Sequence, residues 1–254
     1  MMLVDSHCHL DFPEFDDDRA ELIRRCGELG IQRFIVPGVR ASSWQHLYEV
    51  SQCHLEIIPA YGLHPCFVGQ HTPEDIVRLE KLITAYHPVA IGEIGLDYYQ
   101  KQEKQQQIEF FSEQLRLAEK YHLPVILHVR KAHDDVLRLL KQKKLVGGIV
   151  HAFNGSEQQA AQYNELGFLL GFGGTLLNKN ARKITNLAKK LPLQWMVLET
   201  DSPDMAPAEQ ANRRNTPLTI YPVANALAFL RRVTLAHIAE VTTENLFFKI
   251  PFHL

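Results

Sequence analysis

Residue types that bind divalent metal ions recur in this chain at the ends of short apolar runs. Six of them fall at such positions: His7, His9, Glu93, His128, His151 and Asp201. Imidazole nitrogens and carboxylate oxygens are common protein ligands of zinc and related ions. Four imidazoles and two carboxylates are enough for two ions, and two ions that share a bridging carboxylate form a hydrolase site. The residue types therefore predict a dinuclear, metal-dependent hydrolase.

The sharpest local motif is Asp5-Ser6-His7-Cys8-His9, which follows the first apolar run. Residues i and i+2 of a strand point to the same face, so His7 and His9 can hold one ion together. Cys8 points to the other face by the same rule and is excluded as a ligand. Two solvated loop histidines are the alternative, but the recurrence of ligand types at other strand ends favours a metal site.

The candidate ligands include two carboxylates, Glu93 and Asp201, and each has a second acidic residue near it in the sequence, Asp97 or Glu199. Glu93 ends the run Val-Ala-Ile-Gly-Glu, where a carboxylate is costly unless it is paired or bound to metal. We expect Glu93 to bridge two ions, with a helix cap or a salt bridge as the alternative. Asp201 follows the last apolar run and is placed to hold one ion and to accept a proton from water. Asp97 either supports a ligand or starts a helix, and Glu199 either orients a ligand or forms an ordinary buried pair.

The remaining candidates are histidines and arginines. A lone histidine at a strand end is more often a core residue, but His128 and His151 close consecutive runs, which favours metal binding. His64 is not needed as a ligand, so we expect it to contact the substrate and to take part in catalysis, since the usual pKa of histidine is ~6.5. Arg130 and Arg213 are candidates for holding a phosphate, because the guanidinium group matches its geometry. Each of these three residues has a plain structural or surface role as its alternative.

Such ligands need a fold that brings distant strand ends together. Short apolar runs, typical of strands buried on both faces of a parallel sheet, predict eight strands near 2–6, 33–37, 56–62, 88–93, 124–128, 148–151, 168–172 and 195–200. Helical patterns lie between and after them, at 18–29, 73–86, 104–121, 133–143, 156–165, 179–189, 217–230 and 234–247.

This alternation indicates an α/β fold with a parallel sheet. The length of 254 residues is close to the ~250 typical of one (β/α)₈ TIM barrel, so we expect a single barrel domain over 1–254. In such a barrel the carboxyl ends of all strands meet on one face, where active sites are built. The long polar loop at 202–217 follows the eighth strand on that face, and unstructured loops of this length are usually functional or disordered.

Composition and charge narrow the class of protein. The net charge of −2 gives no cationic surface, so any nucleic acid must be bound through a local patch or a metal. There is no GxSxG motif of a serine hydrolase, no signal peptide and no apolar run of the ~18 residues that a membrane span needs. The cysteines show no CxxC spacing: Cys8, Cys26, Cys53 and Cys66. We expect a cytoplasmic protein with reduced thiols, no membrane association and no obligate protein partner.

Together these motifs resemble the TatD family. The segments that carry the resemblance are Asp-Ser-His-Cys-His-Leu at 5–10, Gly-Leu-His-Pro at 62–65, Gly-Glu-Ile-Gly-Leu-Asp at 92–97, Pro-Val-Ile-Leu-His at 124–128, His-Ala-Phe-Asn-Gly-Ser at 151–156, Glu-Thr-Asp-Ser-Pro at 199–203 and Thr-Glu-Asn-Leu-Phe at 243–247. Members of this family are metal-dependent hydrolases with a TIM barrel, within the amidohydrolase superfamily, and the pattern is most similar to its YjjV-type members.

The resemblance implies two divalent cations per chain and the hydrolysis of phosphodiester bonds, typically in DNA. It implies one ion held by His7, His9 and Asp201, the other by His128 and His151, with Glu93 shared. The sequence leaves the metal open among zinc, manganese, cobalt, iron and magnesium, although magnesium prefers oxygen ligands.

Three positions depart from the family pattern: Val129 and Lys131, on either side of Arg130, and Ala152. The family often has serine before that arginine and an acidic residue after it, and serine or cysteine in place of Ala152. These positions lie on the substrate side, so they put the substrate in question more than the metals. Hydrolysis of an amide, a lactone or an acyl ester, such as an aminoacyl ester, is the second hypothesis. A metal-binding protein without catalysis is the third, and the complete ligand set argues against it.

Overall fold

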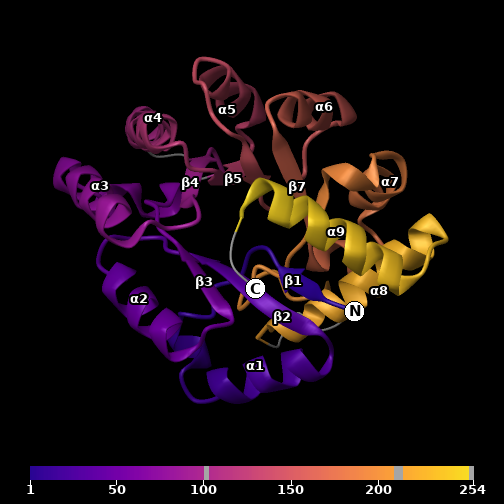
Figure 1. Ribbon diagram of the computed structural model, residues 1–254. Helices are drawn as coiled ribbons and strands as arrows, with labels where there is room; N and C mark the ends of the chain where they lie inside the picture. Colours follow the sequence, from indigo (N-terminus) through magenta and orange to yellow (C-terminus); the bar gives the residue numbers. More distant parts are fainter. Residues whose placement is uncertain (100–102, 209–213, 252–254) are drawn as a thin grey trace.

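Parallel strands alternate with helices around a closed barrel, as the sequence predicts. The computed structural model describes residues 1–99, 103–208 and 214–251 (Figure 1). Within them the strands are β1 Leu3–Asp5, β2 Ile31–Pro37, β3 Ile57–Ala60, β4 Ile91–Asp97, β5 Val125–Arg130, β6 Gly148–Val150, β7 Phe168–Phe172 and β8 Met196–Leu198. All eight predicted strands are confirmed, with shifts of a few residues at their ends.

The strands pair in the order in which they follow along the chain. The strands β1, β2 and β3 form one hydrogen-bonded parallel sheet, and β4 through β8 form a second parallel sheet. A bridge between Tyr61 and Ile91 connects β3 to β4. The Ser6 backbone N–H donates to the Leu198 carbonyl at 2.9 Å and closes the ring between β1 and β8. All carboxyl ends therefore lie on one face, as in a TIM barrel.

Nine helices are seen in the described part of the chain. They are α1 Arg19–Glu28, α2 Trp44–Cys53, α3 Pro73–Tyr86, α4 Lys104–Tyr121, α5 His133–Leu140, α6 Glu157–Glu165, α7 Arg182–Lys190, α8 Ile220–Arg231 and α9 Leu235–Lys249. Short 3₁₀ turns lie between them, at Pro13–Phe15 (η1), Pro65–Gln70 (η2), Gly174–Leu177 (η3), Leu193–Trp195 (η4) and Pro217–Thr219 (η6). None of these helices is long and apolar enough to cross a membrane.

The helix α2 was absent from the sequence prediction. It buries Trp44, Leu47 and Val50, which are spaced by three residues on one face, and the Trp44 indole N–H donates to the Gly62 carbonyl at 3.1 Å. The three-residue spacing was the available signal, but the helix is short and its other residues are mostly polar. The helix predicted at 217–230 is an α-helix only from Ile220, because its first turn is the 3₁₀ turn η6.

Apolar side chains fill the inside of the barrel, and the last helix covers its amino-terminal end. Inward-facing residues of different strands, such as Ile35, Ile126 and Val197, form one cluster with Leu246 and Ile250 from the end of α9. Figure 1 shows α9 lying across this opening of the barrel. Because α9 covers one end, the polar side chains at the carboxyl ends of the strands are left to form the open mouth.

The strand β4 runs further toward the mouth than predicted. It continues to Asp97, and its partner β5 continues to Arg130, with Asp97 paired with Arg130. Gly95 permits this close pairing, since a Cβ there would lie 2.0 Å from the His128 carbonyl oxygen. Glu93 therefore lies inside a strand rather than at its end. The alternative that Asp97 starts a helix is wrong, because Asp97 ends β4 and α4 begins at Lys104.

A buried carboxylate ties the first strand to the segment after the last one. Asp5, at the end of β1, accepts hydrogen bonds from the backbone N–H groups of His7 and Thr200, at 3.2 and 3.0 Å, and from the Thr200 hydroxyl at 2.6 Å. The Asp201 backbone N–H donates in turn to the His7 carbonyl at 2.9 Å. These bonds fix the backbones of His7 and Asp201 relative to each other.

Removal of the Asp5 carboxylate should therefore destabilise the fold. Asp5→Ala leaves the buried His7 backbone N–H without an acceptor, which costs about 1–3 kcal/mol. It also removes the bond from the Thr200 hydroxyl and leaves the Thr200 backbone N–H with only a long bond of 3.4 Å to the His7 carbonyl. We expect a lower free energy of unfolding in urea, whereas Asp17→Ala, which removes an exposed aspartate of the same β1–α1 connection, should have little effect. Equal stability of the two variants would contradict the role of Asp5.

Candidate metal centre

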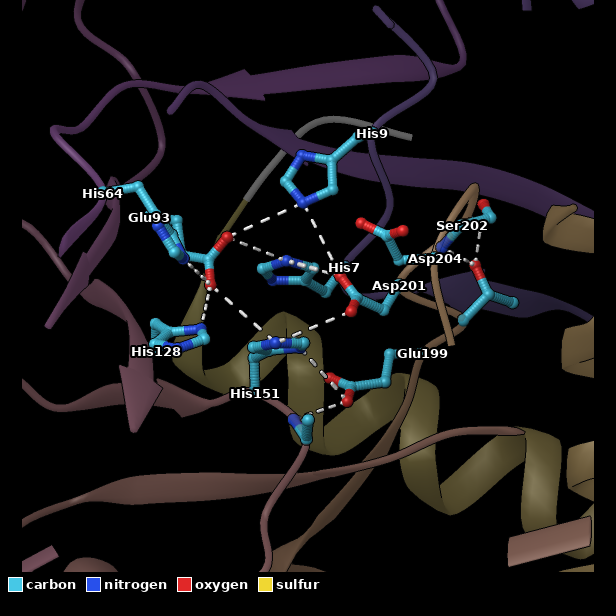
Figure 2. Close-up of polar contacts among 12 residues, drawn as sticks. His7, His9, His64, Glu93, His128, His151, Glu199, Asp201, Ser202 and Asp204 are labelled. Carbon is cyan, nitrogen blue, oxygen red and sulfur yellow. Dashed lines mark hydrogen bonds and ion pairs between the residues drawn. The ribbon is translucent and has the colours of Figure 1, made fainter. Parts of the chain in front are cut away.

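Glu93 lies at the centre of a cluster of imidazoles at the mouth of the barrel. One of its oxygens, Oε2, is 3.2 Å from His7 Nε2 and 3.6 Å from His9 Nε2. Both histidines follow β1, and Figure 2 shows their rings on one side of the Glu93 carboxylate. The predicted convergence of His7, His9 and Glu93 is observed.

The second oxygen of Glu93 faces a different set of rings. Oε1 is 3.1 Å from His128 Nδ1, 3.3 Å from His64 Nε2 and 3.7 Å from His151 Nε2. His64 follows β3, His128 lies in β5 and His151 follows β6. The carboxylate thus presents one oxygen to each half of the cluster, which is the arrangement that a bridging carboxylate requires.

Asp201 completes the half of the cluster that contains His7 and His9. Its Oδ1 is 3.4 Å from His7 Nε2 and 3.6 Å from His9 Nε2, and its Oδ2 is 3.9 Å from His151 Nε2. The Asp201 backbone has a φ of 56°, in the left-handed region that aspartate tolerates better than most residues. Its side chain is 14% exposed, so it reaches both the buried imidazoles and the open mouth.

The donor set fits divalent cations. Two groups have ligand atoms that all lie within 4.8 Å of one another: His7 with His9 and Asp201, and His7 with Glu93 and His151. Both ring nitrogens of His7 are buried and lack a hydrogen-bond partner within the described residues. A buried polar atom without a partner is costly, and a cation would engage the one that faces the two carboxylates.

Charge within the cluster shifts the proton affinities of its members. Burial alone would raise the pKa of Glu93, but His64, His7 and other imidazoles hold it well below its usual range. Burial opposes protonation of His9 and His151, yet the neighbouring carboxylates raise the pKa of His9 to about 9 and that of His151 to about 10. Protons therefore compete with metal ions for these nitrogens, and metal affinity must fall as the pH is lowered.

Two further carboxylates contact the outer sides of the histidines. Asp97 Oδ2 is 3.0 Å from His128 Nε2. Glu199 Oε1 is 3.4 Å from His151 Nδ1 and accepts a hydrogen bond of 2.6 Å from the Ala152 backbone N–H. Both residues thus contact candidate ligands, in the positions from which carboxylates commonly orient metal-binding histidines.

His64 is held by the turn that follows it. Its Nδ1 accepts a hydrogen bond of 3.0 Å from the Cys66 backbone N–H, which assigns the ring proton to Nε2 on the side of Glu93. Burial lowers the pKa of His64 to about 4, so the ring is neutral at pH 7. A neutral ring can donate a hydrogen bond but is poorly suited to transfer a proton. A histidine with the usual pKa of ~6.5 would be able to do both.

A cavity of about 430 Å³ opens beside the cluster, over the carboxyl ends of β5 to β8. Its lining includes His151, Asp201, Arg130 and Asn154. Of the two arginines predicted to hold a phosphate, Arg130 lines this cavity and Arg213 lies outside the described residues.

The sequence prediction assigned no role to Tyr99, whose ring centroid is 3.8 Å from the Arg130 guanidinium carbon. Its only sequence signal is its position two residues after Asp97.

Comparison with known proteins places this site in a family. The family model described as TatD related DNase matches residues 4–248. The chain belongs to the TatD family. It is 36% identical over 247 residues to the uncharacterized metal-dependent hydrolase YabD of Bacillus subtilis, and the match covers 96% of this chain and 97% of that protein.

Solved and more distant relatives agree with this assignment. The crystal structure of the TatD homologue YjjV from Escherichia coli superposes with a TM-score of 0.95 at 34% identity, covering 99% of this chain and 98% of that one. The human protein named deoxyribonuclease TATDN3 is 29% identical over 259 residues, with 96% and 92% of the two chains covered. The TIM-barrel fold and the class of metal-dependent hydrolase are thus confirmed.

The contact between Glu199 and His151 leads to a prediction about metal affinity. Glu199→Gln removes a buried charge next to the outer nitrogen of His151, and loss of such a partner typically weakens metal binding 10–100-fold. Competition between the protein and a chromogenic chelator for zinc would measure this change. Glu157→Gln, which breaks only an exposed pair with Lys190, is the matched control and should bind zinc like the unmodified chain. Equal zinc affinity in both variants would exclude a role for Glu199.

Proposed function

We propose that this chain is a dinuclear phosphodiesterase that acts on DNA or a related nucleic acid. The observation that carries the proposal is the Glu93 carboxylate, whose two oxygens face two different groups of imidazoles. Two metals that share such a bridge favour in-line displacement at phosphorus. The description of the family model as a DNase and the name of the human relative support nucleic acid as the substrate class.

We divide the ligands between two ions in the way that the resemblance to the TatD family implies. One ion would be held by His7, His9 and Asp201, the other by His128 and His151, with Glu93 common to both. The bound cations supply Lewis acidity, which polarises phosphoryl oxygens and makes water a stronger acid. Imidazole-rich sites suit zinc, manganese, iron or cobalt better than magnesium.

Asp201 is the residue that we assign to proton transfer. Burial would raise the pKa of its carboxyl, but His151, His9 and His7 outweigh that effect and lower it. Asp201 is therefore ionised at neutral pH and able to accept a proton from the attacking water. Its partial exposure toward the cavity places it between the imidazoles and an incoming substrate.

We assign substrate contacts to His64, which is buried beside Glu93, and to Arg130, which lines the cavity. The neutral His64 ring carries its proton on Nε2, 3.3 Å from Glu93 Oε1, and can donate it to a phosphoryl oxygen once Glu93 binds metal instead. Arg130 lines the cavity, and its guanidinium makes no hydrogen bond or ion pair to any described residue. A guanidinium with unused donors suits a phosphate group.

The surroundings of Arg130 favour a single strand over a duplex. Tyr99 is 56% exposed, and its ring centroid lies 3.8 Å from the Arg130 guanidinium carbon and 4.8 Å from the Lys131 amine. Exposed aromatic rings beside cations are typical of proteins that bind single-stranded nucleic acid, where bases stack and phosphates pair. This local patch compensates for the overall charge of −2.

A panel of substrates tests the reaction class. With manganese or zinc supplied, the protein should hydrolyse bis-p-nitrophenyl phosphate and a single-stranded oligonucleotide, and a chelator should abolish both activities. A phosphomonoester, an amide and an acyl ester complete the panel. If the metal-loaded protein cleaves the acyl ester or the amide but neither phosphodiester, the second hypothesis from the sequence replaces this proposal.

A second experiment tests the substrate contact at Arg130. Arg130→Gln should raise KM for a single-stranded oligonucleotide. It should also reduce the slope of log KM against log salt concentration by about 1, the effect of losing one phosphate contact. Arg116→Gln removes an exposed arginine on α4 that pairs with Glu113, and it should leave both quantities unchanged. If the KM and the salt slope of Arg130→Gln match those of Arg116→Gln, Arg130 does not bind phosphate.

A further inference from the structure

A cluster that contains sulfur lies directly beside the two-ion centre. Cys66 Sγ is 3.4 Å from Asp97 Oδ2, and the same oxygen is 3.0 Å from His128 Nε2. Ligand atoms of His64, Cys66 and His128 all lie within 4.8 Å of one another. Figure 2 shows His64 and His128 as neighbours on the same side of Glu93. Neither Cys66 nor Asp97 is a metal ligand in the two-ion arrangement.

The distances in this cluster match those between ligands of one tetrahedral ion. Zinc–sulfur bonds of about 2.3 Å and zinc–nitrogen or zinc–oxygen bonds of about 2.0 Å place sulfur and oxygen ligands roughly 3.5 Å apart, and nitrogen and oxygen ligands roughly 3.3 Å apart. The observed separations of 3.4 and 3.0 Å are close to these values. An ion would need only small side-chain movements to bind there.

We propose that Cys66, Asp97 and His128 form an additional metal site, selective for ions that bind sulfur, such as zinc or cobalt. Binding breaks the S–H bond of Cys66, forms a sulfur–metal bond and releases the proton to solvent. Thiolate ligands favour zinc and cobalt over magnesium, which prefers oxygen. This proposal goes beyond the proposed function, because it depends on donors that the two-ion centre does not use.

The imidazole of His128 connects the two positions. Its Nδ1 lies 3.1 Å from Glu93 Oε1, whereas its Nε2 lies 3.0 Å from Asp97 Oδ2. An ion at the sulfur-containing site would be coordinated by His128 Nε2. The ring proton would then be on Nδ1 and would point toward Glu93. In that state His128 cannot also serve the ion that Glu93 and His151 would hold. Occupation of the additional site should therefore weaken binding of the second ion of the pair.

Cobalt spectroscopy tests the site without reference to activity. A cobalt–thiolate bond gives an intense near-ultraviolet charge-transfer band that imidazole and carboxylate ligands do not produce. We expect this band in the full chain and in Cys53→Ser, which removes an exposed cysteine on α2, but not in Cys66→Ser. Absence of the band from the full chain, or its persistence in Cys66→Ser, would overturn the proposal.

A second experiment, alkylation of the unmodified chain, tests the same site even if Cys66→Ser does not fold. The rate at which iodoacetamide alkylates each cysteine is measured by peptide mass spectrometry. Zinc should slow the reaction of Cys66, whereas magnesium should not. Cys53 should react at the same rate with either ion. Zinc that leaves the rate at Cys66 unchanged would refute the site. Phosphodiester hydrolysis with manganese is measured separately, so failure of one proposal is distinguishable from failure of the other.

Discussion

The burial of one carboxylate governs the arrangement of this site. Glu93 lies inside the barrel mouth, where an isolated charge would be too costly to keep. Five imidazoles, which follow β1, β3 and β6 or, in the case of His128, lie in β5, surround its two oxygens and compensate for that cost. The strands must therefore end where they do, because each histidine has to reach the same carboxylate. The barrel is the fold that brings such ends together.

Much of this arrangement follows from local sequence patterns, and the remainder depends on contacts in space. The strands and the candidate ligands were predictable, because buried apolar runs are short and polar residues such as His151 at their ends are conspicuous. The extension of β4 to Asp97 was not, because it depends on how closely Gly95 approaches the neighbouring strand. The helix α2 was missed for lack of a long apolar pattern. The proximity of Cys66 to Asp97 could not be predicted, because the two residues are brought together only by the pairing of strand ends.

The site also shows how a nearly neutral chain creates local charge. The carboxylates are drawn into the mouth, where imidazoles surround them, while Arg130 and Lys131 stay on the rim against the ring of Tyr99. The negatively charged carboxylates are thus buried, whereas the positively charged Arg130 and Lys131 lie near the surface. The exposed cations and the buried cluster therefore lie at different depths of the same mouth.

The bonds of Asp5 have a consequence for the timing of synthesis. The two bonds from Thr200 to Asp5 join residues that are 195 positions apart, so they cannot form before Thr200 has been synthesised. A ribosome-bound fragment that ends before β8 contains His7, His9 and Glu93 but not Asp201, and its barrel is still open. Such a fragment lacks both β8, which closes the ring against β1, and Asp201, one of the candidate ligands.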